Sequence, residues 1–125
     1  MKEYSILQQE KENFCVCSVL QAIFDKYCIS MSQEEISKNL TPSKKGFMID
    51  DHKIKNFLKK QGFNYTPYWK NETPFNEPEM VLEEMVKNDG FIGIGNHVYL
   101  VNGFDDPGII VTDPADVSKI EKDLY

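Results

Sequence analysis

Three cysteines and two histidines are the residues of this chain best suited to supply a nucleophile and its general base. Cys15 lies at the first turn of a predicted helix, where the partial positive charge of the helix N-terminus lowers the pKa of a thiol and favours the reactive thiolate. On a helical wheel Cys15 lies roughly 120° from the centre of the apolar side, and Cys17 roughly 80°. We therefore interpret Cys15 as a thiol at the margin of the core, and Cys17 and Cys28 as ordinary buried thiols.

A histidine and an aspartate stand at the ends of two neighbouring predicted strands. His97 opens one strand, and Asp113 closes the next strand sixteen residues later, directly before Pro114. Two antiparallel strands joined by a hairpin can bring these side chains together. A carboxylate there would hold the imidazole in one tautomer and stabilise the imidazolium. Cys15, His97 and Asp113 are thus the candidates for a nucleophile, its base and the group that orients the base.

The other reactive side chains fit binding or catalytic roles less well. His52 follows two aspartates at a predicted helix start and is interpreted as a solvent-facing residue of the first turn. A zinc site built from Cys15, Cys17 and His97 is disfavoured, because structural zinc sites separate paired cysteines by two to four residues and use four ligands. Trp69 and its neighbouring tyrosines fit packing better than a ligand platform. No metal and no cofactor is expected.

Helices dominate the first part of the chain. Apolar residues recur at the helical period after Phe14, and Ser32 stands three residues before Glu35, which is the spacing of a capping box. Gly62 is placed to end a helix. These signals predict four helices, over residues 14–27, 32–40, 50–62 and 78–87.

Strands follow the helices. Runs of β-branched and aromatic residues predict strands over residues 91–94, 97–104 and 109–112, and an alternating segment predicts a short strand at 64–69. The turn residues at 105–108 make the last two strands an antiparallel hairpin. Helices first and strands last predict an α+β fold in which helices cover one side of an antiparallel sheet. At 125 residues we expect one domain, spanning residues 1–125.

The chain carries this constellation in a recognisable order. Gln9 precedes the run 13–20, which contains Cys15; the run 95–101 contains His97, and the run 111–114 ends in Asp113 and Pro114. This pattern resembles the bacteriocin-processing peptidases that cleave double-glycine leaders, and their stand-alone relatives, a branch of the papain-like cysteine peptidases. The resemblance covers nearly the whole chain. One position departs from it, because Val16 stands where the family usually has glycine.

The resemblance implies a papain-like fold and a role for each residue. Cys15 would attack a carbonyl carbon, His97 would act as base and then as acid, and Asp113 would orient His97. The side-chain amide of Gln9 and the backbone N–H of Cys15 would form the oxyanion hole. The implied reaction is hydrolysis of a peptide amide bond through a thioester on Cys15, after small residues such as a double glycine. Two alternatives remain open: a papain-like acyl transferase or amidase, and a degenerate domain that binds a peptide without cutting it.

Charge and composition limit the partners and the compartment. All fourteen basic residues are lysines and none is arginine, while residues 63–125 carry a net charge of −8 from four lysines and twelve acidic residues. This balance disfavours nucleic acid. The resemblance implies a peptide or a small acyl compound as the substrate. Residues 1–14 lack the apolar run of a signal peptide, and no segment has the ~20 apolar residues of a membrane span. With three cysteines, we expect a cytoplasmic protein without disulfides. The oligomeric state stays open.

Overall fold

The structure, a computed structural model, consists of a group of helices followed by one sheet. It describes residues 4–40, 50–67, 87–94, 97–105 and 108–124. The helices in this part of the chain are α1 (Cys15–Lys26), α2 (Gln33–Leu40) and α3 (Asp51–Lys60). The strands are β1 (Phe91–Ile94), β2 (His97–Asp105), β3 (Gly108–Asp113) and β4 (Asp116–Leu124). The strands lie in the order β1-β2-β3-β4, and every neighbouring pair is antiparallel.

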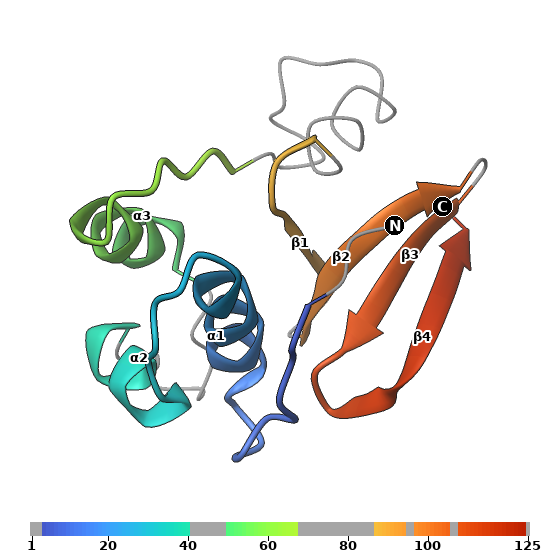
Figure 1. Cartoon of the computed structure of the whole chain (residues 1–125), viewed down its shortest axis with the longest axis horizontal. Coiled ribbons are helices and arrows are strands. Elements are labelled where there is room, and N and C mark those ends of the chain that lie inside the picture. The colour runs from blue at the N-terminus through green and yellow to red at the C-terminus, as the bar shows by residue number, and fades with distance from the viewer. Residues whose placement is uncertain (1–3, 41–49, 68–86, 95–96, 106–107, 125) are drawn as a thin grey trace.

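The helices gather on one side of the sheet, with α1 between the sheet and the other two helices (Figure 1). The α+β class predicted from the sequence is therefore confirmed. Among the described helices, none is long and apolar enough to cross a membrane.

The main core lies between α1 and strand β2. Helix α1 is apolar on most of its surface, and its buried side chains pack with Val98 and Leu100 of β2. Phe24, near the end of α1, meets Phe57 of α3 edge to face, with ring centroids 5.7 Å apart. Because α1 is buried by both the sheet and the other helices, the position of Cys15 at its first residue is fixed by tertiary packing.

Two of the three predicted helix starts that lie in the described part have a side-chain cap, whereas Phe14, before α1, makes no such hydrogen bond. The hydroxyl of Ser32 accepts a hydrogen bond from the backbone N–H of Glu35 at 3.1 Å, as the capping-box spacing predicts. The carboxylate of Asp50 accepts from the N–H groups of His52 and Lys53, at 3.0 and 3.3 Å. The predicted starts of α2 and α3 are thus confirmed.

Helices α1 and α3 end in the same backbone arrangement. After α3, Gly62 has a φ of +90°, and its N–H and that of Phe63 donate to carbonyls of the last helical turn. After α1, Cys28 has a φ of +63° and occupies the equivalent position. This left-handed position at a helix end usually holds glycine. It turns Cys28 outward, so the interpretation of Cys28 as a buried thiol was wrong: its side chain is exposed.

The hairpin of β2 and β3 forms as predicted, with Asp105 opposite Gly108. The register shifts between Val101 and Gly103, at a bulge. Strand β4 was not predicted from the sequence. Its charged residues have low strand propensity, but they suit a strand at the edge of the described sheet, where β4 pairs with β3.

Of the two remaining predicted elements, one is not formed and the other lies almost entirely outside the described residues. Residues 64–67 form no strand, and the prediction of one there was wrong. Tyr65 instead stacks on Phe91, with ring centroids 6.1 Å apart, and its hydroxyl donates to Asp51 at 2.7 Å. Side-chain contacts thus hold this segment without strand pairing. The helix predicted at 78–87, apart from its last residue, and Trp69 lie outside the described residues.

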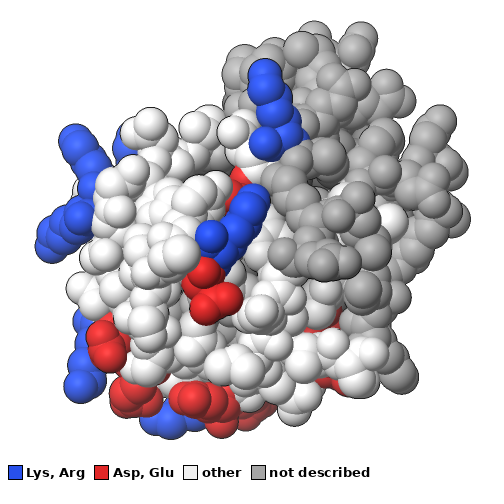
Figure 2. All heavy atoms as spheres, viewed as in Figure 1, with Lys and Arg blue, Asp and Glu red and all other residues white. Residues whose placement is uncertain are grey.

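Lysine and acidic side chains are both spread over the molecular face drawn in Figure 2, and they adjoin one another near its middle. Lysines stand out at the edge where α3 lies, and acidic side chains gather along the lower edge near α2. Helix α3 has the sequence DHKIKNFLKK, which carries four of the lysines. On the described atoms of this face, neither sign of charge forms a continuous surface.

Candidate active site

His97 and Asp113 meet across the strands β2 and β3. The Nε2 atom of His97 lies 2.6 Å from Oδ1 of Asp113, and the two side chains are 25% and 22% exposed. The His97 ring also contacts the ring of Tyr99 edge to face, with centroids 4.8 Å apart. The imidazole is therefore held on two sides while part of it faces solvent.

The contacts of Asp113 determine which nitrogen of His97 carries a proton. Oδ1 of Asp113 also accepts the backbone N–H of Ala115 at 2.8 Å, which fixes the carboxylate on the turn after β3. An ionised carboxylate can only accept hydrogen bonds, so Nε2 must be the protonated nitrogen. In the neutral ring the other nitrogen, Nδ1, then keeps its lone pair and can act as a base.

Cys15 is the first residue of α1, and its thiol lies against the beginning of strand β2. The residue is 6% exposed, and the backbone N–H of Val98, which directly follows His97, faces its sulfur. Asp113 is close enough for its charge to act on the same thiol. The structure thus gathers Cys15, Asp113 and the backbone next to His97 in one region. The contact of the Cys15 sulfur with the His97 ring stays a prediction.

Burial opposes the expected effect of the helix N-terminus on Cys15. Burial raises the pKa of the Cys15 thiol, and the Asp113 charge adds to the rise. The backbone N–H groups of Val98, Val16 and Cys15 act in the opposite direction but do not compensate. The expectation that the thiol pKa is lowered was therefore wrong for the thiol by itself. A thiolate at neutral pH requires a cation beside it.

The two residues that follow Cys15 in α1 belong to the core. Cys17 is completely buried, and burial raises its pKa to about 12. Val16 is 1% exposed and packs within the main core. The side chain that departs from the usual glycine thus points into the protein interior. Its volume is taken up by the core.

Gln9 lies beside the turn that leads into α1 and beside the turn after β3. Its backbone N–H donates to the carbonyl of Pro114 at 2.8 Å. Its side-chain Nε2 donates to the carbonyls of Lys11 and Glu12, both at 2.9 Å, and its Oε1 is buried without a hydrogen-bond partner. The role of this amide in an oxyanion hole stays a prediction, and that role would require one N–H to leave its carbonyl.

The comparison with known families decides what this arrangement belongs to. The model of the Peptidase C39 family matches residues 3–124. The chain belongs to the peptidase C39 family. This is a family of papain-like cysteine peptidases related to the bacteriocin-processing enzymes, as the resemblance of the sequence implied. No curated protein matches the chain.

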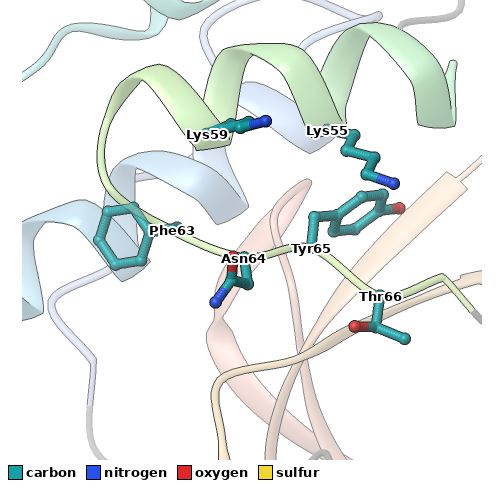
Figure 3. Close-up of a pocket in the computed structure, with 6 residues that line it drawn as sticks. All are labelled: Lys55, Lys59, Phe63, Asn64, Tyr65 and Thr66. Atoms are coloured by element: carbon teal, nitrogen blue, oxygen red, sulfur yellow. The ribbon is translucent and has the colours of Figure 1, made fainter.

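Elsewhere in this C39 family member, a pocket opens beside α3, with a volume of about 420 Å³. Its lining comes from two lysines of α3 and from the segment after that helix, and comprises Lys55, Lys59, Phe63, Asn64, Tyr65 and Thr66 (Figure 3). Phe63 packs on Phe24, near the opposite end of α1 from Cys15. The pocket is therefore separate from the candidate active site.

No group of three or more His, Cys, Asp or Glu side chains in the described ranges is arranged to hold a metal ion. His52 is exposed in the first turn of α3, as the sequence predicted.

Three buried or clustered groups of polar side chains were not predicted from the sequence. Thr112 donates to the side chain of Asn102 at 2.6 Å, and both are buried next to the bulge of β2. Asp89 accepts hydrogen bonds from Tyr4, Tyr27 and Lys26. Gln33 is completely buried. The turn signal at Asp89-Gly90 and the glutamine inside the capping box were visible in the sequence, but their partners are distant along the chain.

Proposed function

We propose that this protein is a cysteine peptidase that hydrolyses a peptide amide bond, with Cys15 as nucleophile, His97 as base and Asp113 as the residue that orients His97. The observation that carries the proposal is the His97–Asp113 hydrogen bond of 2.6 Å, beside a thiol at the start of α1. The neutral imidazole then keeps the lone pair of Nδ1 for the proton of a thiol.

In the proposed reaction His97 first takes the proton of Cys15. The thiolate forms a C–S bond to the scissile carbonyl carbon, and the carbonyl π electrons move onto oxygen. As the oxyanion collapses, the C–N bond breaks and His97 gives its proton to the leaving amine. A water then attacks the thioester while His97 takes one of its protons. The C–S bond breaks, and the acid is released with the Cys15 sulfur as leaving group.

The burial of Cys15 explains why His97 is essential in this proposal. The pKa of the Cys15 thiol is raised by burial, so an isolated thiolate is disfavoured at neutral pH. A neighbouring imidazolium stabilises the thiolate electrostatically, and Asp113 in turn stabilises the imidazolium. The Gln9 amide and the backbone N–H of Cys15 are the proposed donors to the oxyanion.

The substrate is proposed from family membership. Related enzymes process leaders that end in a double glycine, and we propose a bond after small residues here as well. We further propose that residues 1–125 form one catalytic domain and that the protein works in the cytoplasm on peptides, without nucleic acid or insertion into a membrane. Transfer of the acyl group to another nucleophile is the nearest alternative, because the same thioester serves it.

A binding module without turnover is the second candidate. The burial of Cys15, which is 6% exposed and has a raised thiol pKa, favours this candidate. In such a protein the cleft would hold a peptide, and the thiol would remain protonated.

The test of these candidates is acylation by p-nitrophenyl acetate, which reports on any acyl-enzyme chemistry. The proposal predicts release of p-nitrophenol by the wild type and none above background by Cys15→Ala. Cys17→Ala is the matched control: it loses a completely buried thiol two residues away and about 1 kcal/mol of stability, but keeps turnover. A wild type no faster than Cys15→Ala favours the binding module. Loss of turnover in a folded Cys17→Ala protein shows that the wrong cysteine was chosen.

A further inference from the structure

Gln33, the first residue of α2, is a completely buried amide with every polar group engaged. Its Oε1 accepts the backbone N–H of Glu10 at 2.9 Å. Its Nε2 donates to the carbonyl of Gln8 at 3.0 Å and to Oε1 of Gln21 at 3.1 Å, with the carbonyl of Leu7 at 3.5 Å. One side chain of α2 thus forms hydrogen bonds with both a backbone donor and backbone acceptors of a segment that is distant along the chain.

That segment is the N-terminal strap, which we define as residues 4–13. The bonds from Gln33 reach the strap at Gln8 and Glu10, on both sides of Gln9. Ser18 of α1 adds a bond of 2.5 Å from its hydroxyl to the carbonyl of Leu7. Because the backbone is held immediately before and after Gln9, Gln33 limits the positions that Gln9 can adopt.

Gln9 in turn connects the strap to the candidate site. Its N–H donates to Pro114, the residue after Asp113. Its side-chain amide donates to Lys11, whose carbonyl also accepts the N–H of Phe14, the residue before Cys15. Gln33 therefore acts, through Gln9, on both the turn that follows Asp113 and the turn that precedes Cys15.

The orientation of the Gln33 amide is determined by its surroundings. The amide of Gln21 donates to the carbonyl of Met31 at 3.2 Å, which leaves its Oε1 to accept from Gln33. A buried amide that loses such partners is destabilised, because its polar groups are no longer solvated. An apolar side chain of similar size could fill this position, so packing of α2 does not require an amide here. The amide therefore serves to bind the strap as well as to pack α2.

We propose that Gln33 is a positioning residue for the oxyanion hole: it fixes the strap so that the Gln9 amide and the turn into Cys15 hold the geometry that acyl transfer needs. This inference rests on the proposed function. Displacing a catalytic group by about 1 Å costs on the order of 100-fold in rate. The role therefore predicts an effect on turnover from a side chain that touches no substrate.

The test compares Gln33→Met, which keeps the length of the side chain but forms none of these bonds, with the wild type on p-nitrophenyl acetate. We expect kcat to fall about 10- to 100-fold with little change in KM. Alkylation of Cys15 by iodoacetamide should keep its rate, because that reaction develops no oxyanion. Gln33→Asn, whose shorter side chain cannot reach all of the partners, should lower kcat in the same direction and covers the case in which Gln33→Met does not fold.

Two controls separate positioning from general loss of stability. Ile36→Val removes a methyl group from a completely buried residue of the same helix, and should lower the melting temperature but not kcat. Adding Gln33→Met to Gln9→Ala should lower kcat no further than Gln9→Ala does by itself, because both act through one amide.

The outcomes also separate this inference from the proposed function. A kcat for Gln33→Met equal to that of the wild type or of Ile36→Val, or additive losses in the double variant, overturns the positioning role and leaves the peptidase proposal standing. A wild type without turnover, or turnover that survives Cys15→Ala, overturns both.

Discussion

Nε2 of His97 and Oδ1 of Asp113 lie 2.6 Å apart, across two strands joined by a hairpin, and the same carboxylate oxygen accepts the N–H of Ala115. The backbone bond holds the carboxylate, and the carboxylate holds the imidazole. The charge of Asp113 serves His97 but also raises the pKa of the Cys15 thiol. In the proposed reaction, an imidazolium between them would offset the repulsion between the carboxylate of Asp113 and the thiolate of Cys15.

Asp113→Asn separates the charge of this residue from its shape. The asparagine oxygen can still accept from Nε2 and from Ala115, but the imidazolium loses its anionic partner. We expect kcat to fall by about 10²-fold or more, within the range of general acid–base catalysis. The measurement is turnover of p-nitrophenyl acetate beside a thermal melt.

Asp113→Ala is the companion variant, because it removes the turn bond to Ala115 as well. It should lose turnover at least as severely and should also melt at a lower temperature than Asp113→Asn. Full turnover in a folded Asp113→Asn protein would exclude the carboxylate from the site.

Gln9→Ala tests the oxyanion hole. If the amide donates to the developing charge, kcat should fall by about 10²- to 10³-fold with little change in KM. Because the amide now donates to the carbonyls of Lys11 and Glu12, the variant should also lose about 1–2 kcal/mol of stability. Gln9→Glu places oxygens against those carbonyls and should be at least as damaging. Undiminished kcat with reduced stability would make Gln9 a residue of the turn only.

Cys28→Gly should stabilise the protein. Cys28 holds a φ of +63°, which is unfavourable for a residue with a Cβ and suited to glycine. We expect a gain of about 0.5–1 kcal/mol in the free energy of unfolding, measured in urea. Gly62→Ala, at φ +90° with open space around the added Cβ, should lose a similar amount. A destabilised Cys28→Gly protein would mean that the thiol makes a contact that outweighs the strain.

Asp89 should make stability depend on acidity. Its burial pushes its pKa up, but hydrogen bonds from Lys26, Tyr27 and Tyr4 outweigh burial and hold the pKa below its ordinary value of 3.8. The carboxylate therefore stabilises the fold above that value, and the stabilisation is lost as the pH falls through the lowered pKa. Asp89→Asn should be about 1–2 kcal/mol less stable than the wild type at pH 7, with the difference shrinking towards pH 2. A difference that stays constant with pH would contradict this role.

The features predicted correctly from the sequence are those whose signals are local. The cap at Ser32, the helix start near Asp50, the stop at Gly62 and the hairpin from 105 to 108 each depend on residues a few positions apart. Strand β4 was missed because its charged residues become a strand only by pairing with β3. The exposure of Cys28 was missed because its type suggested burial, whereas the end of α1 determined its conformation.

The candidate site likewise has some features that could be predicted from the sequence and others that could not. Cys15, His97 and Asp113 could be chosen from a short list of reactive residues and from their order along the chain. The raised pKa of Cys15 could not be predicted, because it depends on how deeply α1 is packed against β2. The contacts of Gln33 with the N-terminal strap could not be predicted either, since they join residues more than twenty positions apart.

The central claim is that His97 makes Cys15 a thiolate at neutral pH, and the pH dependence of alkylation tests it most directly. Iodoacetamide is applied to the wild type and to His97→Asn between pH 5 and 10, and the modification of each cysteine is followed by mass spectrometry of its peptide. Exposed Cys28 reports on the reagent, and completely buried Cys17 reports on unfolding. We predict that Cys15 of the wild type reacts at and below pH 7, and that in His97→Asn its reaction appears only at alkaline pH, because burial then leaves the thiol protonated. Identical profiles for Cys15 in the two proteins would contradict the account.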